Sequence, residues 1–291
     1  MTAALGHEPS LVERWYRLAV HAYPSAHRSE HGAEIVGALM EAAPSGRRLP
    51  SPRETAALVG SGLAVRARRA AEGPAPWWAD GLHLGVLILA VANLAYAFAD
   101  HTTPAWTAVS AALVLTLMRG WTRVALPLAL FVTFSTGRAM VFGAFWTGGS
   151  LFGPTYGNWV SLTPYWILAA GTAVLAVRGS RDLRARSWWW AAIPVLAFAL
   201  TAGGLAYGAP WQGMRAAVEG ALLLAGIGAT ITTRSPRWAL AAAIHIVPGG
   251  LNTVLHLPMS SRQDSAYRLI LAALLIAMAA LSRRDGKQAL A

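Results

Sequence analysis

The chain has 291 residues, of which 55% are hydrophobic and 13% are charged, and its mean hydropathy is +0.44. So much apolar surface exceeds what one water-soluble core can bury, and the composition therefore predicts helices that face lipid. The net charge of +11 does not indicate nucleic-acid binding, because the basic residues lie between apolar runs rather than on one soluble face. The lack of cysteine excludes disulfides, thiolate metal sites and cysteine nucleophiles.

Residues 1–75 are predicted to form a cytoplasmic helical prefix. The start of the chain is polar and has no apolar stretch of the kind found in a signal peptide. Three helices are predicted, over 11–22, 29–42 and 51–71, with capping signals at Ser10 and Ser51. Leu11, Trp15 and Leu18 share one face of the first helix. Arginines in the last turns of the third helix are expected to meet anionic lipid at the inner leaflet.

Eight apolar segments with the length of membrane spans follow the prefix. They cover 81–99, 102–118, 124–146, 159–177, 188–207, 214–231, 238–257 and 266–281. The predicted fold class is therefore all-α, a polytopic transmembrane helical bundle of about eight spans within residues 81–282. A short cytoplasmic tail covers 283–291. The second and eighth segments are short, so a six-span bundle with a re-entrant hairpin is the alternative.

Arginines mark every second connector of this predicted bundle. They lie between spans two and three, four and five, and six and seven, and again after span eight. The opposite connectors carry almost no basic residues and comprise Asp100-His101, 147–158, 208–213 and the segment around Arg262 and Asp264. The asymmetry predicts a multi-pass protein of the bacterial inner membrane with both termini in the cytoplasm. Tryptophans at the predicted span ends are typical of the headgroup region.

Polar side chains inside the spans are the candidate site, because an unpartnered charge is costly in a bilayer. Arg138 and Glu219 both lie in the outer half, and with Asn252 and His256 they are predicted to line an outward-facing polar cavity that binds a small molecule. The alternatives are a structural ion pair, or an Arg215–Glu219 pair that reaches up to the interface.

His245 is the deepest of these polar candidates and lies near the middle of span seven. The sequence Pro248-Gly249-Gly250 follows it and is expected to break or kink that span. Broken helices expose backbone groups at transporter binding sites, but they also serve as plain packing devices. Both interpretations stay open at this point. The spacing of Gly81 and Gly85 in span one is typical of a close helix contact.

The sequence predicts neither a metal site nor a cofactor. His245 and His256 are three helical turns apart, so they can share a face but not one metal ion. His27, Glu30 and His31 match the H-x-x-E-H pattern of zinc proteases, but they straddle the predicted start of the second helix and lack a further ligand. No nucleophile elbow, Walker loop, dinucleotide fingerprint or aspartate-rich diphosphate motif occurs in the sequence, so no catalytic residue is assigned.

One segment of the prefix resembles a known type of sequence. Tyr23 to Glu34 follow the pattern Y-P-x3-R-x3-G-x-E, directly after the basic and aromatic stretch Arg14 to Leu18. This resembles the prefix ahead of the membrane portion in some bacterial permease-like and uncharacterised integral membrane proteins. The resemblance covers about a tenth of the chain. It implies a cytoplasmic helical module joined to a membrane domain, with no catalytic residue to transfer.

The predicted function is that of a transporter-like or permease-related component of the membrane. One alternative is a membrane anchor or sensor, in which residues 1–75 dock a cytoplasmic protein partner. The other is an intramembrane enzyme that acts on a lipid or isoprenoid and uses Glu219, His245 or His256 as acid or base. The expected partners are the lipid bilayer and an unidentified small molecule.

Overall fold

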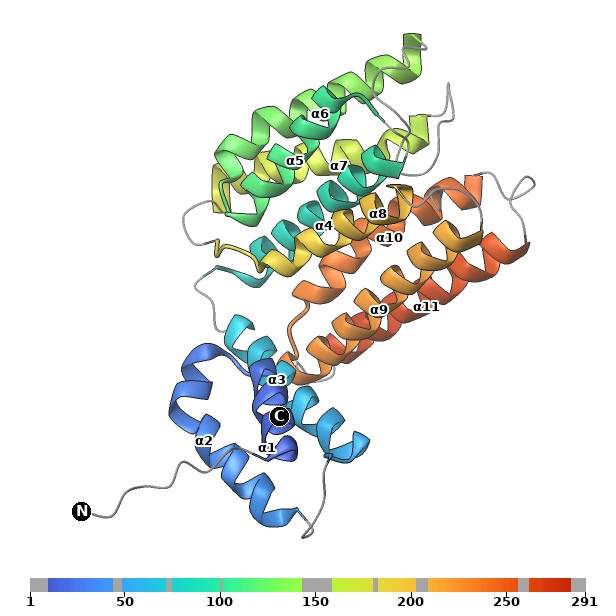
Figure 1. Ribbon diagram of the computed structural model, residues 1–291. Helices are drawn as coiled ribbons and strands as arrows, with labels where there is room; N and C mark the ends of the chain where they lie inside the picture. Colours follow the sequence, from blue (N-terminus) through green and yellow to red (C-terminus); the bar gives the residue numbers. More distant parts are fainter. Residues whose placement is uncertain are drawn as a thin grey trace, which may run out of the picture. The chain divides into compact units, whose positions relative to one another are not determined.

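The computed structural model describes residues 10–43, 49–71, 75–99, 102–142, 159–179, 183–202, 209–255 and 262–283 (Figure 1). All regular secondary structure in these residues is helical, which confirms the all-α class. The chain folds as two compact units, Met1–Glu72 and Gly73–Ala291, called unit 1 and unit 2 below.

Unit 1 contains three α-helices whose starts follow the capping signals in the sequence. They are α1 (Leu11–Ala19), continued by η1 (Val20–Ala22), α2 (Ser25–Ala42) and α3 (Pro52–Ala71). At the start of α3, Ser51 Oγ accepts from the Glu54 amide at 3.1 Å and Glu54 Oε2 accepts from the Ser51 amide at 3.0 Å. This reciprocal pair is a capping box, which satisfies two backbone donors that the helix itself leaves free.

The core of unit 1 is held by polar contacts as well as apolar ones. The Tyr16 hydroxyl donates to Glu54 Oε2 at 3.1 Å, and Tyr23 bonds to Ser61 at 2.5 Å. The Arg66 guanidinium donates to three successive backbone carbonyls where η1 ends, including that of Tyr23 at 2.9 Å. The buried apolar side chains around these contacts are Val12, Tyr16, Val20, Tyr23, Val36 and Leu58.

The predicted start of the second helix at Ser29 was wrong. Helix α2 begins at Ser25, directly after Pro24, because the fixed φ of proline suits the residue ahead of a helix. The H-x-x-E-H string is thus wholly helical, and the His27 ring lies between those of Tyr23 and His31, with centroids 5.2 and 4.9 Å away. Within the described residues, no three His, Asp or Glu side chains are grouped so that they could hold a metal ion.

In the described residues of unit 2, one α-helix overlaps each of the eight apolar segments of the sequence. They are α4 (Trp77–Ala99), α5 (Pro104–Met118), α6 (Thr122–Phe142), α7 (Thr163–Val174), α8 (Ala192–Ala202), α9 (Ala209–Thr233), α10 (Arg237–Leu255) and α11 (Arg262–Arg283). Short helical turns extend two of them: η3 (Trp159–Leu162) and η4 (Leu175–Gly179) flank α7, and η5 (Trp188–Ala191) precedes α8.

The ends of several helices differ from the prediction. Helices α9 and α11 begin about five residues earlier than expected, so residues 209–213 and Arg262 are helical rather than part of connectors. Helix α10 is not broken: it runs unbroken from Arg237 to Leu255 with Pro248 inside it. The predicted connectors at 100–101 and 147–158 and the tail after Arg283 lie outside the described residues.

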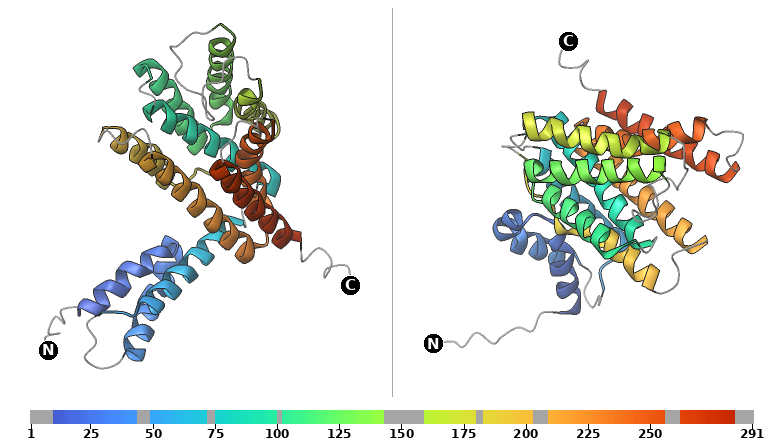
Figure 2. Two further views of the ribbon diagram at one scale, coloured as in Figure 1. Left: turned by 90° about the vertical axis from the view of Figure 1, so that its right-hand side faces the viewer. Right: turned by 90° about the horizontal axis from the view of Figure 1, so that it is seen from above.

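Helices α4 and α10 are the centre of unit 2. Helix α4 packs against α5, α7, α8 and α10, and α10 also packs against α9 and α11. Helix α6 completes the unit by packing on α5 and α7 (Figures 1 and 2). The main buried cluster therefore lies around α4 and includes Leu87, Leu113, Leu117, Leu168 and Leu175.

Two glycines bring the central helices together. A Cβ at Gly81 would lie 2.7 Å from the Arg237 carbonyl oxygen, and one at Gly85 would lie 2.6 Å from Ile244 Cδ1. Because no larger residue fits at these distances without a shift, the two glycines set how closely α4 approaches α10. This is the contact that the G-x-x-x-G spacing predicts.

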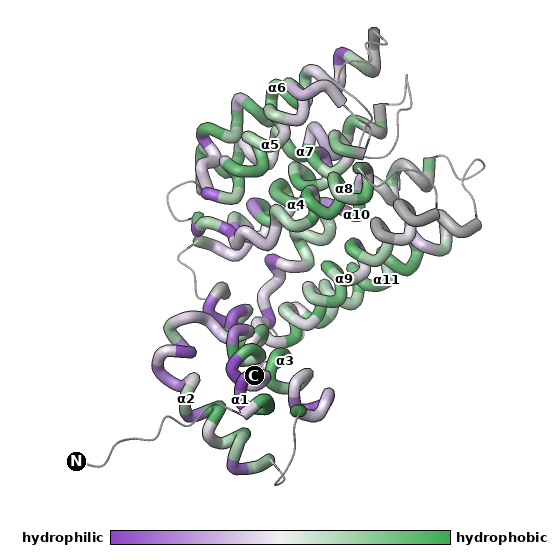
Figure 3. The backbone as a smooth tube through the Cα atoms, viewed as in Figure 1, coloured by the Kyte–Doolittle hydropathy of each residue, from purple (hydrophilic) through white to green (hydrophobic). Residues whose placement is uncertain are grey.

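Two helical stretches in the described residues have the length and composition needed to cross a membrane. They are Trp77–Phe98 of α4 and Ala216–Thr233 of α9. Shorter apolar stretches occur at Pro104–Met118, Trp188–Leu200 and Ala266–Ser282. The two long stretches differ in burial, because 72% of the first is buried inside the protein but only 17% of the second. Figure 3 shows apolar residues along most of the helices of unit 2, whereas hydrophilic residues are frequent in unit 1.

Candidate functional site

An apolar pocket lies between α4, α9, α10 and α11 in unit 2. Its volume is about 200 Å³, and the indole of Trp190 from η5 also contributes to its wall. The lining is almost entirely aliphatic or aromatic and includes Leu84, Ile88, Leu223, Ala242, Leu271 and Met278. A space of this size accepts a small ligand, and its walls favour one with an apolar body.

Two polar side chains, Glu219 and His245, line this pocket, and a third, Tyr267, contacts Glu219; we call the three residues the acid trio. Glu219 of α9 accepts a short hydrogen bond from the Tyr267 hydroxyl of α11. The other carboxylate oxygen, Oε1, lies 3.7 Å from Nε2 of His245 in α10. The Glu219 and His245 side chains are only 12% and 21% exposed, and both line the pocket. A mostly buried carboxylate with a hydroxyl and an imidazole beside it can bind a cation or a hydrogen-bond donor.

The acid trio contains two of the residues singled out in the sequence. Glu219 and His245 come together, but Arg138 is exposed on α6, and no ion pair joins it to Glu219 in the described residues. Helix α6 packs on α5 and α7, on the other side of α4 from α9 (Figure 1). The side chain of Asn252, and His256 as a whole, lie outside what the structure describes. The structure therefore does not bring Arg138 to the pocket, contrary to the predicted cavity.

Tyr267 is the member of the acid trio that was missed. It falls at the start of the eighth apolar segment, where the sequence suggests only an aromatic side chain near the interface. Its contact with Glu219 would identify it, but that contact can be predicted only when it is known that α9 and α11 are neighbours.

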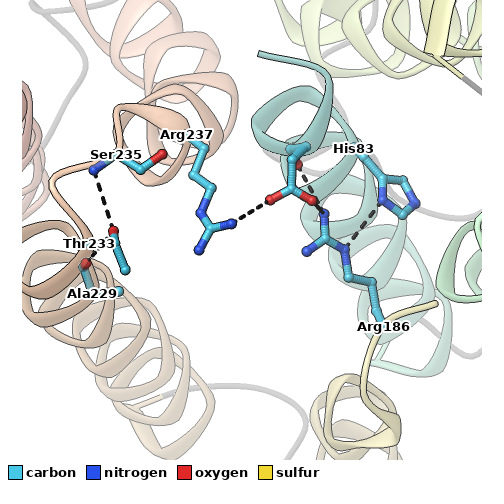
Figure 4. Close-up of polar contacts among 7 residues, drawn as sticks. His83, Arg186, Ala229, Thr233, Ser235 and Arg237 are labelled. Carbon is cyan, nitrogen blue, oxygen red and sulfur yellow. Dashed lines mark hydrogen bonds and ion pairs between the residues drawn. The ribbon is translucent and has the colours of Figure 1, made fainter. Parts of the chain in front are cut away.

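A second polar grouping surrounds Asp80 in the first turn of α4. Asp80 Oδ1 accepts from Arg186 Nη2 at 2.5 Å and Oδ2 accepts from Arg237 Nη1 at 3.1 Å. Arg186 comes from the connector between α7 and α8, and Arg237 begins α10. We call Asp80, His83, Arg186 and Arg237 the Asp80 cluster. Figure 4 shows the two arginines reaching toward the carboxylate between them, with His83 beside Arg186.

His83 in the Asp80 cluster is fully buried and its ring is fixed by two hydrogen bonds. Arg186 Nε donates to His83 Nδ1 at 3.3 Å, so this nitrogen must be the unprotonated one. The other nitrogen, Nε2, then carries the proton and donates to the carbonyl oxygen of Leu117 at 2.8 Å. The cluster therefore ties the start of α4 to α5 as well as to α10 and the α7–α8 connector.

The Asp80 cluster lies at an end of unit 2 where several connectors meet. The Arg186 amide donates to the Met118 carbonyl oxygen at 2.6 Å, and a Cβ at Gly120 would lie 3.0 Å from the Leu183 carbonyl oxygen. We call this the basic end, and it is formed by the start of α4 and by connectors 119–121, 183–187 and 234–236. Each of these connectors carries arginine, and Trp77, Trp121, Trp188 and Trp189 are exposed there.

Comparison with known proteins gives no relative for this chain: no family model, curated protein or solved structure matches it. Function is therefore inferred from the chemistry of the two groupings. The Asp80 cluster consists of charges that already satisfy one another, which is typical of a structural contact. The acid trio, by contrast, adjoins empty apolar space, as expected of a binding site.

Proposed function

We propose that unit 2 is a multi-pass domain of the bacterial inner membrane, in which all eight helices cross the bilayer. Helix α9 supports this proposal, because its apolar stretch Ala216–Thr233 is only 17% buried within the protein. In water such a helix would expose a large apolar patch, whereas in lipid it needs no further cover. Many large apolar side chains on other helices are also exposed, among them Phe131, Phe134, Leu196, Phe198, Leu269 and Ile276.

In the proposed topology the basic end faces the cytoplasm. Arginine-bearing connectors are retained on that side of the membrane, and the exposed tryptophans of the basic end suit the headgroup region. Both chain termini and unit 1 then lie in the cytoplasm. The resemblance of unit 1 to the prefix of permease-like proteins agrees with this placement.

Within that topology, the proposed activity is transporter-like: unit 2 binds a small molecule with an apolar body and one cationic or hydrogen-bond-donating group. The observation that carries the proposal is the position of Glu219 at an apolar pocket, held by Tyr267 and close to His245. The apolar walls would hold the body of the ligand, and the carboxylate would hold its polar group. A charge at this depth is costly, so its retention in an apolar helix favours a role in binding.

A thermal-unfolding experiment on the full chain in detergent tests this proposal. The probes are phenethylamine and 2-phenylethanol, which are similar in size but carry an ammonium and a hydroxyl group. A ligand present at 100 times its Kd stabilises a protein by about 2.7 kcal/mol, which is readily seen as a rise in Tm. We expect the amine to raise the Tm of the wild type more than the alcohol does.

Two variants locate the effect of the amine. Glu219→Gln keeps the size of the side chain but removes its charge, so the rise in Tm should be lost. Arg138→Ala changes an exposed charge on α6, away from the pocket, and should respond as the wild type does. An equal rise in Glu219→Gln, or no rise in any of the proteins, would contradict the proposal.

An enzyme that uses the same residues is the second candidate function. The Glu219 carboxylate accepts a hydrogen bond from a tyrosine hydroxyl and lies close to an imidazole, so protons can be transferred among these groups. Acid–base chemistry on a lipid or isoprenoid requires such transfer. Turnover of such a substrate, lost in Glu219→Gln and in His245→Gln while both proteins still insert, would favour the enzyme over the transporter.

A further inference from the structure

Helix α1 of unit 1 has two apolar faces, and only one of them is used in folding. Val12 and Tyr16 are buried in the core of the unit. Leu11, Trp15 and Leu18 are spaced by four and three residues along a neighbouring face, and they are 56%, 46% and 61% exposed. This spacing places them in one stripe, which we call the α1 stripe. Large apolar side chains gathered in this way on a small domain indicate a surface that binds something.

Charge is distributed unevenly around the α1 stripe. Arg14 and Arg17 are exposed on the same helix, and Arg14, three residues after Leu11 and four before Leu18, lies next to the stripe. Arg17 pairs with Glu13 at 2.5 Å, which leaves the helix with an excess of positive charge. Helix α2 carries three of the acids of the unit, Glu30, Glu34 and Glu41, and the side chains of Glu30 and Glu34 are 63% and 81% exposed. Unit 1 therefore has one face that would attract an anionic surface and another that such a surface would repel.

We propose that the α1 stripe docks onto the anionic inner leaflet of the membrane, with Leu11, Trp15 and Leu18 among the headgroups and Arg14 against lipid phosphates. A helix with Leu and Trp on one side and arginine beside them has the composition of an interfacial helix. This inference rests on the proposed function, because it requires unit 2 to be inserted in that membrane.

The size of the α1 stripe favours lipid over a protein partner. A stable protein interface buries about 800 Å² on each side, far more than three side chains of one helix provide. A membrane contact can be weaker, because the two units are covalently joined. Five residues separate Ala71 of α3 from Trp77 of α4 and span at most about 22 Å, so unit 1 stays close to the proposed membrane surface.

The lack of cysteine in the chain makes a direct test practical. The full chain would be reconstituted in nanodiscs of phosphatidylcholine, with or without phosphatidylglycerol, and labelled with an environment-sensitive dye at Leu18→Cys. Ala38→Cys, on the exposed surface of the acidic helix α2, is the matched control. Acrylamide is the quencher, because it is neutral and is not itself repelled by anionic lipid.

We expect the label at position 18 to shift its emission to the blue and to be protected from acrylamide in anionic nanodiscs, while the label at position 38 stays in water. Each uncompensated arginine near an anionic surface strengthens docking by about fivefold, so adding Arg14→Gln should weaken it by about fivefold and increase quenching. High salt should act in the same direction.

Two results would overturn the docking proposal. One is equal quenching at positions 18 and 38 in both lipid mixtures, since the stripe would then face water. The other is protection at position 18 that does not depend on lipid charge, which would mean that protein covers the stripe. A chain that fails to enter nanodiscs at all would instead contradict the membrane placement of unit 2. Leu11→Cys provides a second label position, because Leu11 is also exposed and its replacement leaves the core intact.

Discussion

A single carboxylate holds two arginines from distant parts of the chain. Asp80 lies 106 residues before Arg186 and 157 residues before Arg237, yet it contacts both. Removing charges from water costs several kcal/mol for each ion, and only close pairing with further hydrogen bonds recovers that cost. In the Asp80 cluster, Arg186 also donates to the Asp80 carbonyl oxygen and to His83. The members of the cluster therefore depend on one another, and loss of the Asp80 carboxylate removes the counter-charge that Arg186 and Arg237 share.

Replacing Asp80 by Asn should destabilise the protein strongly. Two mostly buried guanidinium groups would lose their counter-charge, and breaking a buried ion pair in this way costs about 3–5 kcal/mol. Thermal unfolding of the purified variant in detergent measures the effect. Arg184→Gln is the matched control, because Arg184 is exposed in the same connector and its loss should change stability by less than about 0.5 kcal/mol. A normal Tm for Asp80→Asn would mean that the pairs contribute little.

Some of the polar residues that form contacts in unit 2 can be recognised from the sequence, and others cannot. Glu219 and His245 stand out because each interrupts an apolar run. Asp80, Arg186 and Arg237 lie at the ends of apolar runs, where flanking charges are common and need no partner. Their pairing depends on contacts over more than one hundred residues, which no local pattern encodes.

At the scale of the elements, the informative feature is the close approach of the two central helices, α4 and α10. The atoms nearest to a Cβ at Gly81 would be backbone atoms of Arg237, which cannot rotate away as a side chain can. Gly85 meets Ile244, whose branched Cβ is rigid as well. The helices are therefore held at a separation that only glycine allows, and the start of α10 is brought to Asp80.

We expect Gly81→Ala to destabilise unit 2 by about 1–3 kcal/mol, because the added methyl group would force α4 away from α10. The same change at Gly228 of α9 meets open space and should stabilise its helix by about 0.5–1 kcal/mol. Comparing the Tm of the two variants separates the close contact from the general effect of alanine on a helix. Equal shifts would show that α4 and α10 have room to adjust.

The helices themselves were largely predictable from the sequence, whereas their ends were not. Long apolar runs and capping signals are local features, and a helix lies in each predicted segment. Of the expected break or kink at Pro248, the break does not occur, because α10 continues through the proline, which neighbouring helices allow by packing around the freed backbone groups. Helix α9 begins early, at Ala209-Pro210, where a proline in the first turn is compatible with both a helix start and a connector.

For the whole molecule, the informative feature is that the arginine-bearing connectors meet at the basic end. The sequence predicts that these connectors share one side, and backbone contacts bring 119–121 and 183–187 together. Which side of a membrane this end faces remains a prediction from charge.

Labelling of single cysteines in intact bacteria tests this orientation. Ala185→Cys lies at the basic end, and Ala105→Cys lies at the start of α5, one helix length away from it; both positions are exposed. A maleimide that cannot cross the membrane should label position 105 in intact cells, and position 185 only after the cells are opened. Labelling of position 185 in intact cells would reverse the proposed topology.

The burial of α4 has a consequence for biosynthesis. This helix leaves the ribosome first among those of unit 2, yet 72% of its apolar stretch is covered by helices, most of which are made later. Translation at about 5–20 residues per second delivers Arg237 roughly 10–30 s after Asp80. Arg186 arrives earlier and can pair with Asp80 first, but the contact with α10 waits for Arg237. In the proposed membrane topology, we therefore expect α4 to stay beside the insertion machinery until the helices that cover it have been made.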